Sequence, residues 1–550
     1  MRGTAQSQTK RRHCGKQSGK RDERASGAIH PSPLWGGWPE GAGGFRRNSL
    51  DGEGMSTITR AACIGGGVIG GAWAARFALA GIDVNIFDPH PEAERIIGEV
   101  MANAERAYGM LTMAPLPPRG RFTFCKSVQE AVEDVDWIQE SVPERLPLKR
   151  GVITEIDAAA RPDALIGSST SGLLPSDLQT EMKHPERMFV AHPYNPVYLL
   201  PLVELVGGKK TSPETIRRAE AAVAEIGMKG VVIAKEIEAF VGDRLLEALW
   251  REALWLIKDD ICDTETLDDV MRYSFGMRWA QMGLFETYRI AGGEAGMRHF
   301  LAQFGPCLKW PWTKFTDVVD LDDALVEKIG AQSDKQAAGR SIRELERIRD
   351  VNLVGIMHAL KAGDGGKGWG AGKLLADFEK RLWAKGGDQS KTHDASGPLR
   401  LVDTRVNAAW VDYNGHMTEH RYLQLFGDTS DALLRLIGVD FAYVEAGHSY
   451  YTVETHIRHL GEAKLGQALY TTLQLVSSDD KRIHFFTRIH DAASGDVIAT
   501  AEQMMLHVDA KAGKSVPAPA EVMAKLRPIA EAHAKLPVPE GVGRHVGQRR

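Results

Sequence analysis

Short apolar runs alternate with helical patterns along the first half of this chain. Between residues 59 and 206, apolar runs such as Trp137–Ile138 and Phe189–Ala191 are separated by amphipathic stretches. This alternation predicts a mostly parallel sheet with helices on both faces. After Ala239 the pattern changes to long helical stretches such as Phe240–Ile257, which predict an all-helical second region.

A third pattern follows a polar stretch rich in Gly and Ser at 386–398, which has the composition of a linker. Leu469–Val476 and His484–His490 alternate as strands do, and Arg421–Ile437 has the period of a helix. We therefore expect an α/β domain, then an all-helical domain, then an α+β domain.

Composition narrows the class of protein. With 550 residues the chain is long enough for several domains, and its net charge of -4 argues against nucleic acid as a general partner. The five cysteines are scattered without a C-x-x-C pair, which favours a reducing cytoplasm and predicts neither a disulfide framework nor a metal site. No apolar run approaches the ~20 residues of a membrane span.

The first 54 residues are rich in Arg, Lys, Gly, Ser and Pro and have no apolar periodicity. Such a segment cannot bury enough apolar surface to offset its ordering entropy. Met55 stands just before the first strand pattern, so we expect a disordered extension that results from an over-extended start.

A glycine-rich run with the spacing G-x-G-x-x-G joins the first predicted strand to a helix. Gly65 permits the tight turn, Gly67 lets the backbone approach a pyrophosphate, and Gly70 lets the helix pack closely on the strand. Asp88 ends the next strand pattern, where it can accept the ribose hydroxyls and repel a 2′-phosphate. This combination predicts a Rossmann domain that binds NAD, although a glycine-rich turn in another α/β protein remains the alternative. The residues of the run are Gly65, Gly66, Gly67, Val68, Ile69 and Gly70.

Polar residues follow two later strand patterns, at the edge of the sheet where α/β proteins bind ligands. His192 has a side chain suited to accept the proton of an alcohol, and Ser171 can hold the hydroxyl oxygen. Glu204, on the next strand pattern, can orient the histidine ring and stabilise its protonated form. Each residue taken alone is more often structural.

Together these residues resemble the 3-hydroxyacyl-CoA dehydrogenase family, from about Thr59 to Phe378. The resemblance also includes Phe240–Leu245, which is similar to the first helix of that family's C-terminal domain. The resemblance implies that His192 is the general base, that Glu204 is its partner and that Ser171 binds the substrate hydroxyl. It also implies that Asn195 supports the site and that Glu144 and Lys149 contact NAD.

One departure from the family bears on the substrate. Asp243 stands where the family usually has Asn, and it adds a carboxylate near the expected pocket. The run Gly276–Gly283 resembles the branch that contains lambda-crystallin, L-gulonate dehydrogenase and carnitine dehydrogenase, which implies a small free hydroxy acid as substrate. Asp243 and an aromatic cage that includes Trp279 would suit a cation. Alternatively, Asp243 pairs with Arg244 or another base and the rings belong to the core.

The last segment, from about Leu399 to Asp509, resembles the 4-hydroxybenzoyl-CoA thioesterase type of hot-dog fold. The resemblance implies that Asp412 is the nucleophile or general base and that Asn414, Gly415 and His416 support it. Thr418–Glu419 replace the two Asn that are common in the family. A hot-dog domain kept only for dimerisation is the alternative.

The two resemblances together imply carnitine breakdown, in which carnitine is oxidised with NAD and an acyl-CoA, betainyl-CoA, is hydrolysed. We expect a cytoplasmic homodimer without metal. A 3-hydroxyacyl-CoA or L-gulonate-type dehydrogenase with a fused thioesterase remains open, as does a non-enzymatic protein. The expected parts are 1–54 extension, 55–238 Rossmann domain, 239–384 helical domain for substrate binding and dimerisation, 385–398 linker, 399–512 hot-dog thioesterase domain and 513–550 tail.

Overall fold

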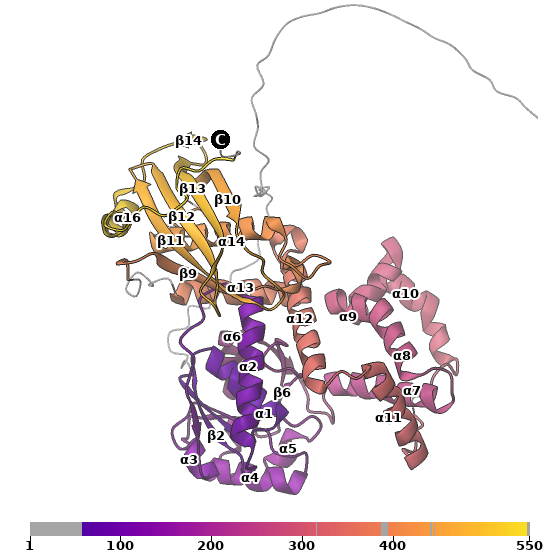
Figure 1. Ribbon diagram of the computed structural model, residues 1–550. Coiled ribbons are helices and arrows are strands. Elements are labelled where there is room, and N and C mark those ends of the chain that lie inside the picture. Colours follow the sequence, from indigo (N-terminus) through magenta and orange to yellow (C-terminus); the bar gives the residue numbers. More distant parts are fainter. Residues whose placement is uncertain (1–57, 315, 387–393, 441–442, 445, 547–550) are drawn as a thin grey trace, which may run out of the picture. The chain divides into compact units, whose positions relative to one another are not determined.

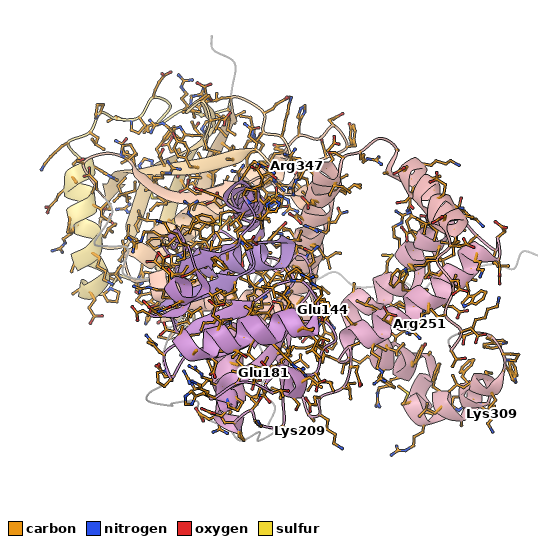
Figure 2. The ribbon with its side chains drawn as sticks, turned by 90° about the horizontal axis from the view of Figure 1, so that it is seen from below. Glu144, Glu181, Lys209, Arg251, Lys309 and Arg347 are labelled. Atoms are coloured by element: carbon orange, nitrogen blue, oxygen red, sulfur yellow. The ribbon has the colours of Figure 1, made fainter. Side chains whose placement is uncertain are left out.

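The computed structural model describes residues 58–314, 316–386, 394–440, 443–444 and 446–546. Figure 1 shows the order of the elements, and Figure 2 adds the side chains. The predicted extension at 1–54 and residues 387–393 of the predicted linker lie outside these residues.

An eight-stranded sheet forms the first part of the chain, in the order β3-β2-β1-β4-β5-β6-β7-β8. All neighbours are parallel except β6 and β7, which run antiparallel. The first six positions have the strand order of a dinucleotide-binding Rossmann sheet, which confirms the predicted α/β domain. The strands are β1 (Arg60–Ile64), β2 (Asp83–Phe87), β3 (Phe122–Phe124), β4 (Trp137–Glu140), β5 (Leu165–Ser168), β6 (Met188–Pro193), β7 (Leu202–Gly207) and β8 (Lys229–Ile233).

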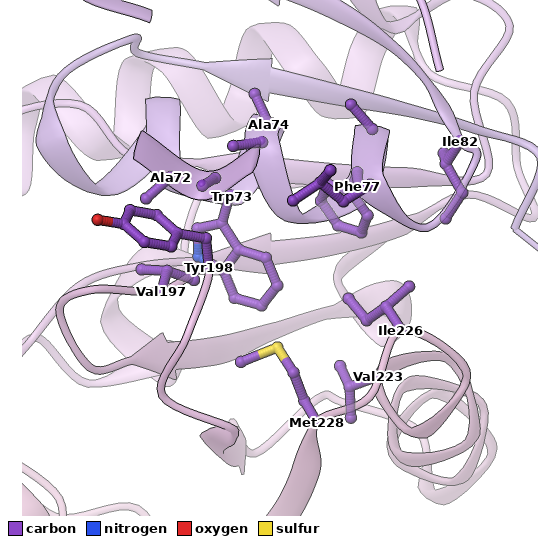
Figure 3. Packing of buried hydrophobic residues seen from close by; sticks show 14 of the residues in the cluster. Ala72, Trp73, Ala74, Phe77, Ile82, Val197, Tyr198, Val223, Ile226 and Met228 are labelled. Atoms are coloured by element: carbon purple, nitrogen blue, oxygen red, sulfur yellow. The ribbon is translucent and has the colours of Figure 1, made fainter. Parts of the chain in front are cut away.

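Helix α1 packs closely on this sheet because its inward residues are small or aromatic. Trp73 stacks on Phe77 with ring centroids 5.5 Å apart, and both rings are fully buried. Figure 3 shows this cluster, where Ile226 and Met228 also pack. Large buried side chains of this kind contribute about 1.5–3 kcal/mol each. The helices of this part are α1 (Val68–Leu79), α2 (Ala93–Leu111), α3 (Val128–Val132), α4 (Leu146–Ala159), α5 (Pro175–Leu178) and α6 (Pro213–Glu225).

The helical region that follows divides its packing between two cores. Val354 and Phe378, on α12 and α13, belong to the same buried cluster as α1. Helices α7 to α11 have only a small core around Ile257 and Leu325, and much of their apolar surface is exposed. The helices are α7 (Gly242–Lys258), α8 (Thr264–Val270), α9 (Gly276–Ala291), α10 (Gly296–Phe304), α11 (Asp323–Ala337), α12 (Ile342–Lys361) and α13 (Gly370–Gly386), with a π-helical turn at Met271–Phe275.

The last part is an antiparallel sheet in the order β10-β13-β12-β11-β9, with the long helix α14 packed against it. Leu425, Phe426 and Leu433 of α14 are fully buried against the sheet. This arrangement agrees with the predicted hot-dog domain. The elements are β9 (Leu399–Arg405), α14 (Glu419–Leu436), β10 (His448–His459), β11 (Ala468–Ser478), β12 (Arg482–Asp491), β13 (Val497–Asp509), β14 (Lys514–Ser515) and α16 (Ala520–His533).

The segment predicted to be a tail after residue 512 has a structure of its own. Strand β14 pairs with β13, and α16 buries Val522 and Leu526 in the hot-dog core. His533 accepts a hydrogen bond from the backbone N–H of Leu475, 2.9 Å away. The folded part of this domain therefore extends at least to His533. Across the residues that the structure describes, no helix combines the length and apolar character needed to cross a bilayer.

Candidate active sites

The glycine run forms a cradle at the N-terminus of α1. Gly65 has φ +98°, and a Cβ there would lie 2.7 Å from the carbonyl oxygen of Ser141, so only glycine fits. A Cβ on Gly70 would lie 1.8 Å from the carbonyl oxygen of Gly65, which explains how closely the helix approaches the turn. A Cβ on Gly67 would have no other heavy atom within 4 Å. The space beside Gly67 is therefore open to a ligand.

The same helix end is suited to an anion. No side chain caps α1, and its first turn carries no acidic residue, so the first N–H groups and the helix dipole favour a phosphate. Asp88, directly after β2, accepts hydrogen bonds from the backbone N–H groups of Gly66 and His90. These bonds hold its carboxylate beside the turn, where a ribose would follow the pyrophosphate. The residues therefore fit NAD.

His192 and Glu204 face each other across the only antiparallel pair of this sheet, among the residues the structure describes. Their strands place them directly opposite in the register of β6 and β7. His192 Nδ1 lies 2.9 Å from Glu204 Oε2, and both side chains are about 4% exposed. Because Nδ1 faces a carboxylate, the neutral ring carries its proton there and leaves Nε2 free to accept one.

Four donors surround the carboxylate of Glu204. Besides His192, the hydroxyl of Tyr194 donates from 2.9 Å, and the backbone N–H groups of Val241 and Gly242 donate from 3.1 Å each. Burial opposes ionisation, but the hydrogen bonds outweigh it, so the pKa of Glu204 lies below its ordinary value. Sequence reasoning missed Tyr194, which follows directly after β6, two residues beyond His192.

Ser171 lies in the loop after β5, and Glu144 orders that loop. Glu144 Oε1 accepts hydrogen bonds from the backbone N–H of Ser171 at 3.1 Å and from the hydroxyl of Thr170. Lys149, only 1% exposed, lies between Glu144 and Glu140, with Nζ at 3.4 and 2.9 Å from their oxygens. The predicted Glu144 and Lys149 thus belong to one ion network, in which Lys149 is buried and Glu144 is 45% exposed.

Glu140 completes that network and was missed by sequence reasoning. It is the last residue of β4, at the carboxyl end of the sheet, and it is fully buried. An acid at the end of a predicted strand is the signal that could have found it.

Asp243 lies beside the histidine, in the first turn of α7. Its Oδ2 is 3.6 Å from His192 Nε2. Burial raises the pKa of Asp243; Glu204 and Glu247 raise it further, while His192 and a hydrogen bond to Ser171 oppose the shift. The structure therefore brings four predicted residues together: Ser171, His192, Glu204 and Asp243.

Two further predicted residues have surroundings of their own. Asn195 is exposed in the loop after β6. Trp279 packs on Phe275, with ring centroids 4.6 Å apart, and does not line the cavity beside Asp243. The indole that lines this cavity belongs to Trp250.

The hot-dog domain has its own group of polar residues in the loop before α14. The Asp412 carboxylate accepts hydrogen bonds from the backbone N–H groups of Asn414 and His416, at 2.9 and 3.3 Å. Partial burial opposes ionisation of Asp412, but these bonds prevail and its pKa is lowered. Gly415, at φ +76°, provides the turn that lets the loop fold back on the carboxylate. His416 Nε2 lies 3.5 Å from the carboxylate of Glu462.

Helix α14 begins directly after this loop. Thr418 is its N-cap residue, but its side chain makes no capping bond, so the first N–H groups of the helix are available to a carbonyl oxygen. Glu419, the first residue of the helix, is exposed. The loop that holds the Asp412 carboxylate therefore leads directly into the N-terminus of α14.

No group of three or more His, Cys, Asp or Glu side chains is arranged to hold a metal ion in the part of the chain that the structure describes. Cys63, Cys125, Cys262 and Cys307 are free thiols. Burial raises the pKa of Cys63, so this thiol is a core residue rather than a nucleophile.

A dinucleotide-binding sheet with a histidine–carboxylate pair, followed by a hot-dog domain, defines a class of enzyme: an NAD-dependent dehydrogenase joined to a thioesterase. Family models agree with each part. The model of the 3-hydroxyacyl-CoA dehydrogenase NAD binding domain matches residues 60–237, and that of the C-terminal domain matches 240–328. The thioesterase-like superfamily model matches residues 406–526.

Relatives match the whole arrangement. The L-carnitine dehydrogenase/betainyl-CoA thioesterase of Rhizobium meliloti (strain 1021) is 94% identical over 496 residues, which cover 90% of this chain and 100% of the relative. The chain therefore belongs to the family of L-carnitine dehydrogenase/betainyl-CoA thioesterases.

Shorter relatives match the first part alone. The L-carnitine dehydrogenase of Pseudomonas putida is 48% identical over 308 residues, which cover 56% of this chain and 96% of the relative. Among solved structures, the NAD+-dependent dismutase 5-formyl-3-hydroxy-2-methylpyridine 4-carboxylic acid 5-dehydrogenase is 26% identical. The match has a TM-score of 0.47 and covers 56% of this chain and 99% of the dismutase chain.

Proposed function

We propose that this chain carries out two reactions: NAD-dependent oxidation of L-carnitine to 3-dehydrocarnitine, and hydrolysis of betainyl-CoA to glycine betaine and CoA. The observation that carries the first reaction is the buried His192–Glu204 pair, in the same sheet as the open glycine cradle. Membership of the family supports both substrates.

The dehydrogenase residues have distinct tasks. Ser171 holds the substrate hydroxyl, and His192 Nε2 removes its proton as the carbon–hydrogen bond breaks. Glu204 stabilises the imidazolium that forms, because its carboxylate is ionised and lies 2.9 Å from Nδ1. NAD, when bound, supplies the acceptor for the hydride. The glycine run and Asp88 would hold it, and Glu144 and Lys149 would act beside it by ordering the Ser171 loop.

Asp243 favours a cationic substrate over a CoA thioester or L-gulonate. Its carboxylate lies 3.6 Å from the base, so a positive charge next to the reacting hydroxyl would be stabilised and a negative charge repelled. Carnitine carries a trimethylammonium group one methylene away from its hydroxyl carbon. The positive charge of this group therefore complements the carboxylate of Asp243.

In the hot-dog domain, Asp412 acts as nucleophile or general base and α14 stabilises the oxyanion. Water supplies the hydroxyl that ends on the acyl carbon, the carbon–sulfur bond breaks, and CoA leaves as the thiol. Asn414, Gly415 and His416 shape the loop that holds the carboxylate. The acidic Glu419 and Glu462 suit an acyl group that carries a positive charge.

A substrate panel tests the first reaction. NADH formation is measured with L-carnitine, L-gulonate and 3-hydroxybutyryl-CoA side by side, and we expect L-carnitine to have the highest kcat/KM. A preference for either other substrate would replace the proposed reaction with that dehydrogenase activity. If none of the three substrates reduced NAD, the alternative of a non-enzymatic protein would be favoured.

We also propose that the enzyme is a cytoplasmic homodimer. The apolar surface of the π-helical turn and α9 includes Tyr273, Met277 and Phe285, each at least 66% exposed, and a second copy would bury it. Edge strand β10 offers a further pairing surface, where Tyr451 and Val453 are exposed. Light scattering of the purified chain should give twice its 60.3 kDa mass, and Phe285→Asp should shift it toward the monomer.

A further inference from the structure

One face of α7 lines a cavity and begins at Asp243, the neighbour of the catalytic histidine. Asp243, Glu247 and Trp250 are spaced four and three residues apart, which places them on the same side of the helix. All three line a cavity of about 480 Å³, whose remaining wall is apolar and comes from α7, α8 and the π-helical turn.

The cavity reaches Asp243, the carboxylate next to the catalytic histidine. Asp243 Oδ2 lies 3.6 Å from His192 Nε2, and a substrate hydroxyl must come within about 3 Å of that nitrogen to lose its proton. The carboxylate of Glu247 lies one helical turn further along. A group attached next to the hydroxyl carbon therefore enters the space between Asp243 and Glu247.

Glu247 is not committed to a strong internal partner. Arg251 Nε lies 3.3 Å from its Oε2, and the two side chains are 42% and 46% exposed. Exposed pairs of this kind are weak, so a bound cation can compete with Arg251 for the carboxylate. The Arg251 side chain is among those labelled in Figure 2.

Trp250 adds a surface that a quaternary ammonium prefers. Such a group has no N–H to donate, so it is recognised by charge and by the faces of aromatic rings. The indole is 56% exposed and borders the same cavity as the two carboxylates. An anionic or long apolar group would leave both carboxylates without a compensating charge.

We propose that Glu247 and Trp250, together with Asp243 beside the histidine, determine the specificity of the dehydrogenase for a quaternary ammonium next to the reacting hydroxyl. This inference rests on the proposed oxidation of carnitine and extends it to residues one and two turns further along α7. Arg251 is the internal competitor of the substrate cation.

The test compares L-carnitine with 3-hydroxy-5,5-dimethylhexanoate, in which carbon replaces the quaternary nitrogen. Glu247→Gln should raise the KM for carnitine about 3- to 10-fold with little change in kcat, and should leave the KM for the neutral analogue unchanged. Trp250→Leu should act in the same direction. Arg251→Gln should lower the KM for carnitine, a result that loss of packing would not produce.

Glu252→Gln is the matched control, since Glu252 lies on the same helix, accepts the backbone N–H of Lys314 at 3.0 Å and does not line the cavity. It should leave both KM values unchanged. If Glu247→Gln changes both KM values equally or neither, this specificity role is wrong while carnitine oxidation by the unmodified enzyme stands. Failure of the unmodified enzyme to oxidise carnitine would instead overturn the proposed function itself.

Discussion

At the scale of single residues, the dehydrogenase depends on one histidine held between two carboxylates of different character. Glu204 has four donors and a lowered pKa, whereas Asp243 has a raised pKa. Glu204 therefore stabilises charge on the ring throughout the neutral range, and Asp243 is the more sensitive to pH. His192→Ala should lower carnitine oxidation by ~10²–10⁴-fold while NAD still binds, as stopped-flow and equilibrium titration can check. Near-normal turnover would remove His192 from the mechanism.

The raised pKa of Asp243 predicts a pH dependence of substrate binding. Its carboxyl group becomes protonated at a higher pH than the ordinary value of 3.8, because burial and the neighbouring acids disfavour its charge. Lowering the pH through that raised pKa should therefore increase the KM for carnitine. Asp243→Asn should flatten this rise, and 3-hydroxy-5,5-dimethylhexanoate, which keeps the carboxylate but lacks the cation, should show a smaller rise. An identical pH profile in the variant would mean that Asp243 is structural.

At the scale of elements, the start of α1 is the part on which cofactor binding depends, and its glycines differ in what they do. Gly67→Ala adds a methyl group to open space, so it should leave Tm unchanged but weaken NAD about tenfold by obstructing the pyrophosphate. Gly70→Ala drives a methyl group into the carbonyl of Gly65, so it should lower stability by about 1–3 kcal/mol. Thermal melts and NAD titrations of the two variants separate these effects. Equal loss of stability in both would contradict the open cradle.

Comparison of the elements shows which features could be predicted from the sequence. Periodicity and glycine spacing predicted β1, α1 and Asp88, because these signals are local in the chain. The four-fold hydrogen bonding of Glu204 depends on the antiparallel register of β6 and β7 and on backbone N–H groups at Val241 and Gly242, which no local pattern encodes. For the same reason, the sequence pattern groups α12 and α13 with the helical region, whereas in the structure Val354 and Phe378 pack in the core of the first domain.

At the scale of the whole molecule, two sites with unrelated chemistry share one chain. Ser171 and His192 lie at the edge of the parallel sheet, whereas Asp412 lies before α14 of the hot-dog domain. Hydride transfer needs no thioester and hydrolysis needs no nicotinamide. Each activity should therefore survive the loss of the other.

The most direct test measures both activities in two variants, as NADH formed from L-carnitine and CoA thiol released from betainyl-CoA. Asp412→Ala should abolish CoA release and leave carnitine oxidation at the rate of the unmodified enzyme. Ser171→Ala should do the reverse. Circular dichroism confirms that each variant is folded. Loss of carnitine oxidation in folded Asp412→Ala, or of CoA release in folded Ser171→Ala, would show one shared site and contradict a chain of two enzymes.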